Sequence, residues 1–241
     1  MELNPETYSQ KNQIFPVWEW SHALEYITHS FPWRYRDFAL ANTERQYRHK
    51  CNLIENLSLC ADPDKGMTFW ILGSWYGHII IPLIAHYFPK IKNILAFDFD
   101  DEVHELCWLF NKRLNDKIVR EKCDVNFDLL FSKRDFSDVK SDWFELHYRP
   151  DIIINTACEH MYYMKHLELN HTNPILGFQT NNYNLEDAHV NCCDTLEEFQ
   201  EQSGINKVLY KSTDPYARNY NDYGDRNNEK YKTLSLIGYQ K

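Results

Sequence analysis

The sequence predicts an α/β fold in three layers: a mostly parallel seven-stranded sheet with a C-terminal antiparallel hairpin, plus a helical N-terminal arm. Three observations carry this prediction. Apolar runs alternate with helical patterns between residues 66 and 205. A glycine turn at 73–77 separates the first run from a helix, and Asp98 ends the second run. The last two runs, 207–211 and 233–239, have no helical pattern between them, which is typical of a hairpin.

Composition limits the classes of protein to consider. The chain has 241 residues, 43% hydrophobic and 25% charged, which fits a globular domain with an added arm. The formal net charge of −9 makes nucleic acid an unlikely partner. Seven cysteines without a CxxC pair favour reduced thiols, so a cytoplasmic location is expected. We expect no signal peptide, and the longest apolar segment, 79–88, is too short to span a membrane.

The N-terminal region reads as helical. Residues 15–59 place apolar side chains at helix-compatible spacings, with a break at Phe31-Pro32. The predicted domains are therefore 1–60, a helical arm or cap, and 61–241, the α/β domain. The basic stretch 34–50 is interleaved with acids, so it is either a solvated helix face or a contact for an anionic partner. The arm either folds over the crevice of the sheet or packs on the sheet edge.

The remaining elements follow from short apolar runs and their spacing. After the glycine turn, helices are predicted up to about 88, at 101–114 and at 195–202. The predicted strands are 69–72, 94–97, 125–131, 151–155, 175–180, 207–211 and 233–239.

The glycine turn and Asp98 together suggest a nucleotide site. Gly73 and Gly77 permit a sharp turn and a close approach of a ligand to the backbone. Asp98, at the carboxyl end of a neighbouring parallel strand, is placed to accept hydrogen bonds from both hydroxyls of a ribose. The turn does not have the GxGxxG pattern, and Trp75 and Tyr76 stand where such loops usually carry small residues.

These motifs resemble those of class I S-adenosylmethionine-dependent methyltransferases, which have a Rossmann-like fold. The resemblance covers residues 66–241, with ILGSWYG as the first motif and FDFDDE as the second. SKRDF resembles the adenine-side motif, and PDIIINTACEH resembles the fourth motif, on the substrate side. The resemblance implies S-adenosyl-L-methionine as the cofactor.

The resemblance also implies roles for individual residues. Gly73, Ser74 and Gly77 would approach the methionyl part of the cofactor, and Trp75 and Tyr76 of the same turn are also counted among the cofactor-binding residues. Asp98 would bind the ribose and Phe99 would lie against the adenine. Asp135 would accept from the adenine amino group beside Phe136, and Asn155 would complete the cofactor site.

Candidate catalytic residues follow the fourth predicted strand. Asn155, Glu159 and His160 would face the crevice, where adjacent Glu and His could supply a general base. The alternative is an ordinary loop pair. No metal is expected, because His160, His166 and His171 have spacings that do not share a helix face.

The leading hypothesis is a methyltransferase that acts on a small polar acceptor. The fourth motif is not Asp/Asn-Pro-Pro-Tyr, which weakens the case for a nucleobase acceptor. Two alternatives stay open: an enzyme that transfers or cyclises the aminocarboxypropyl group of the same cofactor, and a non-catalytic binding module with the same fold.

Overall fold

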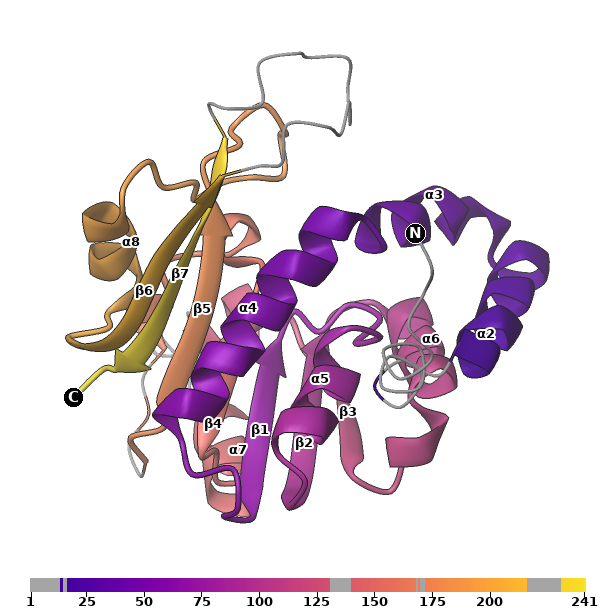
Figure 1. Cartoon of the computed structure of the whole chain (residues 1–241), viewed down its shortest axis with the longest axis horizontal. Helices are drawn as coiled ribbons and strands as arrows, with labels where there is room; N and C mark the ends of the chain where they lie inside the picture. The colour runs from indigo at the N-terminus through magenta and orange to yellow at the C-terminus, as the bar shows by residue number, and fades with distance from the viewer. Residues whose placement is uncertain (1–13, 15–16, 131–139, 168, 170–171, 216–230) are drawn as a thin grey trace, which may run out of the picture.

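A computed structural model describes residues 14, 17–130, 140–167, 169, 172–215 and 231–241. Its centre is a sheet of seven strands in the order β3-β2-β1-β4-β5-β7-β6 (Figure 1). The first five pair in parallel, and β7 is antiparallel to both β5 and β6, which confirms the predicted fold class. The strands are β1 Met67–Leu72, β2 Ile91–Asp98, β3 Ile118–Lys122, β4 Ile152–Asn155, β5 Ile175–Asn181, β6 Lys207–Pro215 and β7 Lys232–Tyr239.

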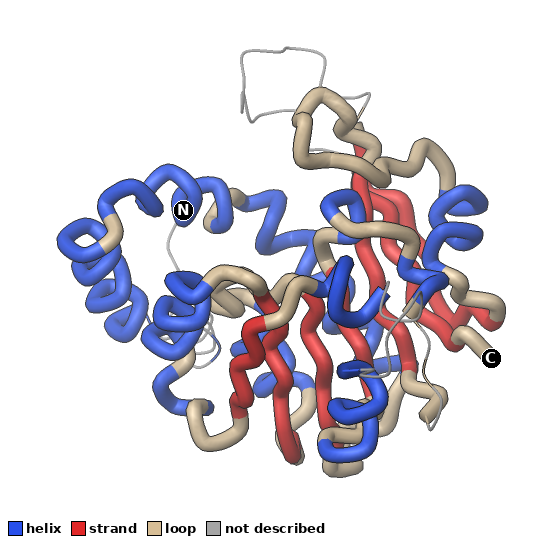
Figure 2. The backbone as a smooth tube through the Cα atoms, turned by 180° about the vertical axis from the view of Figure 1, so that it is seen from behind, coloured by secondary structure: helices blue, strands red, loops and turns tan. Residues whose placement is uncertain are grey.

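Helices cover both faces of the sheet. In β1, Phe69 and Ile71 pack in one apolar cluster with α4 (Glu44–Cys60) and α5 (Ile80–Tyr87). The alternate residues Trp70 and Leu72 pack in a second cluster, with α7 (Lys140–His147) and α8 (Leu196–Ser203). Because successive side chains of a strand point to opposite faces, this uninterrupted apolar strand has a core on each side. Figures 1 and 2 show the two faces.

The N-terminal helices divide between the sheet and a separate cluster. Helix α4 lies on the sheet, with Leu53, Ile54 and Leu57 fully buried. Helices α2 (Val17–Ser30) and α3 (Tyr35–Ala41), joined by the 3-10 turn Pro32–Arg34, instead pack with Tyr76 and α6 (Asp101–Phe110). The division of the chain at residue 60 stays a prediction. None of the helices within the described ranges is both long and apolar enough to cross a membrane.

The predicted strand at 125–131 is wrong. The third strand is β3 at 118–122, and Val125–Leu130 forms a π-helix. Asp124 begins this helix by accepting hydrogen bonds from the amides of Asn126 and Phe127, and Leu129 and Leu130 bury the apolar side. The true strand was overlooked because it is a charged edge strand with a weak apolar pattern. The helix predicted at 101–114 ends at Phe110, and a 3-10 turn follows.

A buried histidine makes stability depend on pH. It packs in the separate cluster formed by α2, α3, Tyr76 and α6, which we call the third cluster. His78 is 3% exposed among Trp20, Phe38 and Phe110, and its Nε2 has no hydrogen-bond partner among the residues that the structure describes. Burial lowers the pKa of His78 to about 3 from the ordinary 6.5. Below pH 6.5 the unfolded chain therefore binds a proton that the folded chain does not, so stability falls as pH falls from 6.5 to about 3.

We expect His78→Phe to weaken this dependence. At pH 5 the neutral ring of His78 costs about 2 kcal/mol of stability relative to pH 7, and phenylalanine removes that cost. Urea unfolding of both proteins at pH 5 and pH 7 measures the difference, with His86→Phe, at an exposed position of α5, as the control. If wild type and His78→Phe lost the same amount of stability between pH 7 and pH 5, His78 would not be the source of the pH dependence.

Candidate functional site

A cavity of about 790 Å³ lies at the carboxyl edge of the parallel strands. This is where a doubly wound sheet places its ligands, because loops after adjacent strands diverge there. Its walls come from five strand ends and from the arm. The lining includes residues of 34–50, 73–80, 98–103, 123–126, 156–161 and 181–189, together with Tyr231.

The glycine turn has an unusual backbone that its two glycines accommodate. Gly73 and Gly77 have φ of +63° and +62°, and Trp75 has φ of +48°. A Cβ on Gly73 would lie 2.5 Å from the Met161 methyl carbon. Since side chains other than glycine rarely adopt this conformation, alanine would be strained at both glycine positions.

Asp98 is the buried acid beside this turn. It is 8% exposed, and its carboxylate accepts hydrogen bonds from the amides of Trp75 at 2.9 Å and Asp100 at 3.2 Å. Burial raises the pKa of Asp98, and these two hydrogen bonds oppose the rise. Phe99 follows with 70% of its surface exposed and lines the cavity. The predicted cofactor residues Gly73, Ser74, Trp75, Gly77, Asp98 and Phe99 therefore share one wall.

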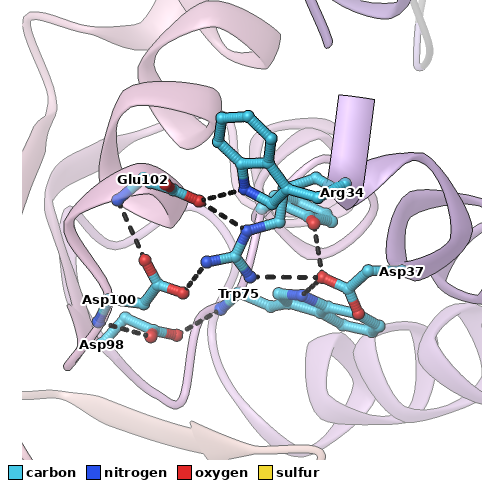
Figure 3. A network of polar contacts seen from close by, with 8 residues as sticks. Arg34, Asp37, Trp75, Asp98, Asp100 and Glu102 are labelled. Atoms are coloured by element: carbon cyan, nitrogen blue, oxygen red, sulfur yellow. Dashed lines mark hydrogen bonds and ion pairs between the residues drawn. The ribbon is translucent and has the colours of Figure 1, made fainter. Parts of the chain in front are cut away.

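Trp75 and Tyr76 have a structural role that explains why the turn departs from small residues. Their side chains donate hydrogen bonds to one oxygen of Asp37 on α3, from Trp75 Nε1 at 3.1 Å and Tyr76 Oη at 2.5 Å (Figure 3). Tyr76 is fully buried in the third cluster, and its side chain does not line the cavity. The turn is therefore the docking point of the arm as well as a wall of the cavity.

Arg34 fastens the arm to the segment after β2. Its guanidinium pairs with Asp100 and with Glu102, the latter at 2.8 Å, and lies 3.6 Å from Asp37 (Figure 3). Burial lowers the pKa of Arg34, but the two acids outweigh burial and raise it overall. Arg34, Asp37 and Lys50 all line the cavity, so the arm folds over the crevice and does not only pack at the sheet edge.

The segment after β4 forms the opposite wall. Glu159, in the 3-10 turn Cys158–His160, is 7% exposed and accepts a hydrogen bond from Asn181 Nδ2 at 2.6 Å. Burial raises the pKa of Glu159 to about 7, while the charge of Lys50 opposes the rise. His160 is exposed at the rim of the cavity. The structure thus brings both groups to the cavity.

Asn155 lies behind this wall. It is fully buried, and its side chain is absent from the cavity lining. Its Oδ1 accepts from the Ala157 amide at 2.9 Å, and its Nδ2 lies 3.0 Å and 3.2 Å from the sulfurs of Met161 and Met164. These contacts hold the turn that carries Glu159.

Three lining groups were overlooked in the sequence. Asp124 directly follows β3, so placing that strand at 118–122 would have found it. Arg34 was recognised only as a residue that could cover the crevice. His189 lies in a loop after β5, 29 positions beyond His160, and no local pattern marks it. The predicted Asp135 and Phe136 lie outside the described residues.

The fold is that of S-adenosylmethionine-dependent methyltransferases, by comparison with solved structures. No known family model matches the sequence, and no curated protein matches it.

Three solved structures illustrate the likeness. The N-methyltransferase NodS from Bradyrhizobium japonicum, in complex with S-adenosylhomocysteine, is 11% identical and has a TM-score of 0.52, covering 92% of this chain and 97% of that one. The plantazolicin methyltransferase BpumL, also in complex with S-adenosylhomocysteine, is 13% identical with a TM-score of 0.50, covering 95% and 98%. The CurJ carbon methyltransferase is 13% identical with a TM-score of 0.54, covering 99% and 72%.

Proposed function

We propose that this chain is an S-adenosylmethionine-dependent methyltransferase that acts on a small polar acceptor. The observation that carries the proposal is the buried carboxylate of Asp98, which shares one cavity wall with the glycine turn. The two hydroxyls of a ribose are hydrogen-bond donors. The Asp98 carboxylate is placed to accept a hydrogen bond from each of them. Solved structures of the same fold include two complexes with S-adenosylhomocysteine, the product of this cofactor.

The proposed cofactor contacts run along one side of the cavity. Gly73, Ser74 and Gly77 approach the methionyl part, Asp98 binds the ribose and Phe99 lies against the adenine. Trp75 and Tyr76 support this wall by fixing the turn to the arm. For the adenine amino group we propose Asp124, because it follows β3 and lines the cavity; Asp135 with Phe136 stays the prediction from sequence.

The proposed acceptor site is the opposite wall. Glu159 and His160 reach the cavity there and would bind or deprotonate the acceptor, while Asn155 positions the turn that carries them. Methyl transfer needs a nucleophile lone pair in line with the sulfonium, so positioning supplies much of the rate. The acceptor is small because the arm covers the crevice, and nucleic acid is disfavoured by the net charge of −9.

Calorimetric titration with S-adenosylmethionine and S-adenosylhomocysteine tests this proposal. We expect both to bind in a one-to-one ratio and NAD, the control, not to bind. Mass spectrometry of the incubated cofactor then separates the chemistries, since methylthioadenosine would indicate transfer of the aminocarboxypropyl group. Absence of binding by both adenosyl ligands would overturn the enzyme assignment and favour a binding module.

A further inference from the structure

Two histidines and a glutamate meet at the acceptor wall of the cavity. Glu159 and His160 follow β4, and His189 comes from the loop after β5. Each offers one ligand atom, and the three atoms lie within 4.8 Å of one another. All three residues line the same cavity as Asp98.

In each imidazole ring Nδ1 lies near a backbone carbonyl oxygen, which leaves Nε2 as the candidate ligand atom. His160 Nδ1 lies 3.1 Å from the carbonyl oxygen of Ala188, and His189 Nδ1 lies 2.5 Å from that of Tyr183. A carbonyl oxygen only accepts, so Nδ1 carries the hydrogen in each ring. In the neutral rings Nε2 then has its lone pair available, which is how outer hydrogen bonds orient metal-binding histidines.

The carboxylate of Glu159 is half satisfied. Its Oε1 accepts from Asn181, but Oε2 is buried and has no hydrogen-bond partner among the described residues. The nearby cation Lys50 makes no hydrogen bond to this oxygen, and its ammonium donates to Gln46 Oε1. A buried oxygen without a partner is costly, and a cation bound at this oxygen would remove that cost.

The loop that carries His189 is held firmly against the turn that carries Glu159. The amides of Val190 and Asn191 both donate to the carbonyl oxygen of Glu159, at 2.8 Å and 3.0 Å. The Asn191 side chain also donates to the carbonyl oxygen of Met161. These bonds hold together the two backbone segments that carry the ligand side chains before any ion binds, which reduces the entropy lost on binding.

We propose that Glu159, His160 and His189 bind one divalent transition-metal ion of the zinc, iron(II) or manganese class. Two imidazole nitrogens and a carboxylate oxygen suit these ions, and three protein ligands leave coordination positions open. Ligand atoms around such an ion lie roughly 3 Å apart, so small side-chain rotations close the site from the present separation. Glu186 Oε2, 3.5 Å from His189 Nε2, is a further carboxylate at the rim.

The three residues line the cavity, so a bound ion would have a role that rests on the proposed function. A hydroxyl or amine of the acceptor bound to the ion would lose its proton to solvent more readily. Its lone pair would then attack the methyl carbon of the cofactor, whose bond to sulfur breaks with the electron pair remaining on sulfur. The acceptor class is therefore a small molecule with an oxygen or nitrogen that binds metal.

The test begins with metal binding alone. Metal-free protein, prepared with a chelator, is titrated with Zn²⁺ and Mn²⁺ by calorimetry, and we expect one tight ion per chain for at least one of them. Co²⁺ then serves as a spectroscopic probe, because seven free cysteines offer competing sites. Weak visible bands without a thiolate charge-transfer band are expected for nitrogen and oxygen ligands. A thiolate band, or absence of binding, would overturn the proposal.

Variants identify the ligands. Glu159→Gln and His189→Gln each retain a side chain that can hydrogen-bond, and each is expected to weaken the ion's affinity by at least about 100-fold. His166→Gln, at an exposed histidine outside the cavity lining, is the matched control and should leave affinity unchanged. Melting curves check that each variant is folded. Equal affinity in wild type and both ligand variants would contradict the site.

The two proposals fail separately. If the metal binds and S-adenosylhomocysteine does not, the metal site stands and the transferase proposal fails. If S-adenosylhomocysteine binds and no metal does, the transferase proposal stands and the metal site fails.

Discussion

Replacing Asp98 by alanine is expected to weaken the binding of S-adenosylhomocysteine by at least about 100-fold. A hydrogen bond to a charged group contributes about 1.5–3 kcal/mol, and this carboxylate would accept two from the ribose hydroxyls. The substitution also removes the acceptor of the Trp75 amide, so the glycine turn loses a contact that fixes its position. Calorimetric titration of wild type and variant measures the change.

Asp101→Ala is the matched control for Asp98→Ala. Its carboxylate belongs to the first turn of α6 and pairs with Lys122, and the side chain is 70% exposed. We expect the affinity of Asp101→Ala for S-adenosylhomocysteine to stay within about two-fold of wild type, because solvent-exposed ion pairs contribute about 0–1 kcal/mol. Asp98→Ala with wild-type affinity would show that the ribose does not bind at this carboxylate.

Replacing Arg34 by methionine is expected to release the arm and to destabilise the fold by about 2 kcal/mol. The substitution leaves the carboxylates of Asp100 and Glu102 close together without their shared cation. The guanidinium is 21% exposed, so the loss is below that of a fully buried pair. Urea unfolding measures the stability, and amide hydrogen exchange in α2 and α3 should accelerate more than in β1.

Arg36→Met separates the loss of the ion pairs from the loss of a positive charge. Arg36 is exposed in the first turn of α3, two positions beyond Arg34, which ends the preceding 3-10 turn. We expect little change in its stability or in exchange of α2. Raising the salt concentration should reduce the difference in free energy of unfolding between wild type and Arg34→Met. The reason is that part of the ion-pair network around Arg34 is accessible to dissolved ions. Similar effects of both substitutions would contradict a specific fastening by Arg34.

The sheet was predictable because its strands carry strong local patterns. The runs at 69–72 and 152–154 are apolar throughout, as is typical of strands buried on both faces. β3 was not predictable in this way, since an edge strand of sequence IVREK buries only Ile118. The apolar run after β3 was mistaken for the strand, although its buried side chains belong to a π-helix.

The candidate site was predictable where it depends on strand ends, and not where it depends on distant segments. Asp98 ends β2 and Glu159 lies four positions after the end of β4, so chain order brings both to the crevice. Asn155 also ends a strand, but its side chain turns inward to the two methionines. His189 and Asp37 reach the cavity through loop and arm packing, which depends on tertiary contacts that no local spacing encodes.

The hydrogen bonds from Trp75 and Tyr76 to Asp37 link the cavity wall to the position of the arm. A ligand that shifts the glycine turn must alter the free energy with which α3 docks. By thermodynamic reciprocity, docking of α3 alters the affinity of the turn for that ligand by the same factor. Binding of a ligand that shifts this turn would therefore be coupled, through these two aromatic residues, to the docking of α3.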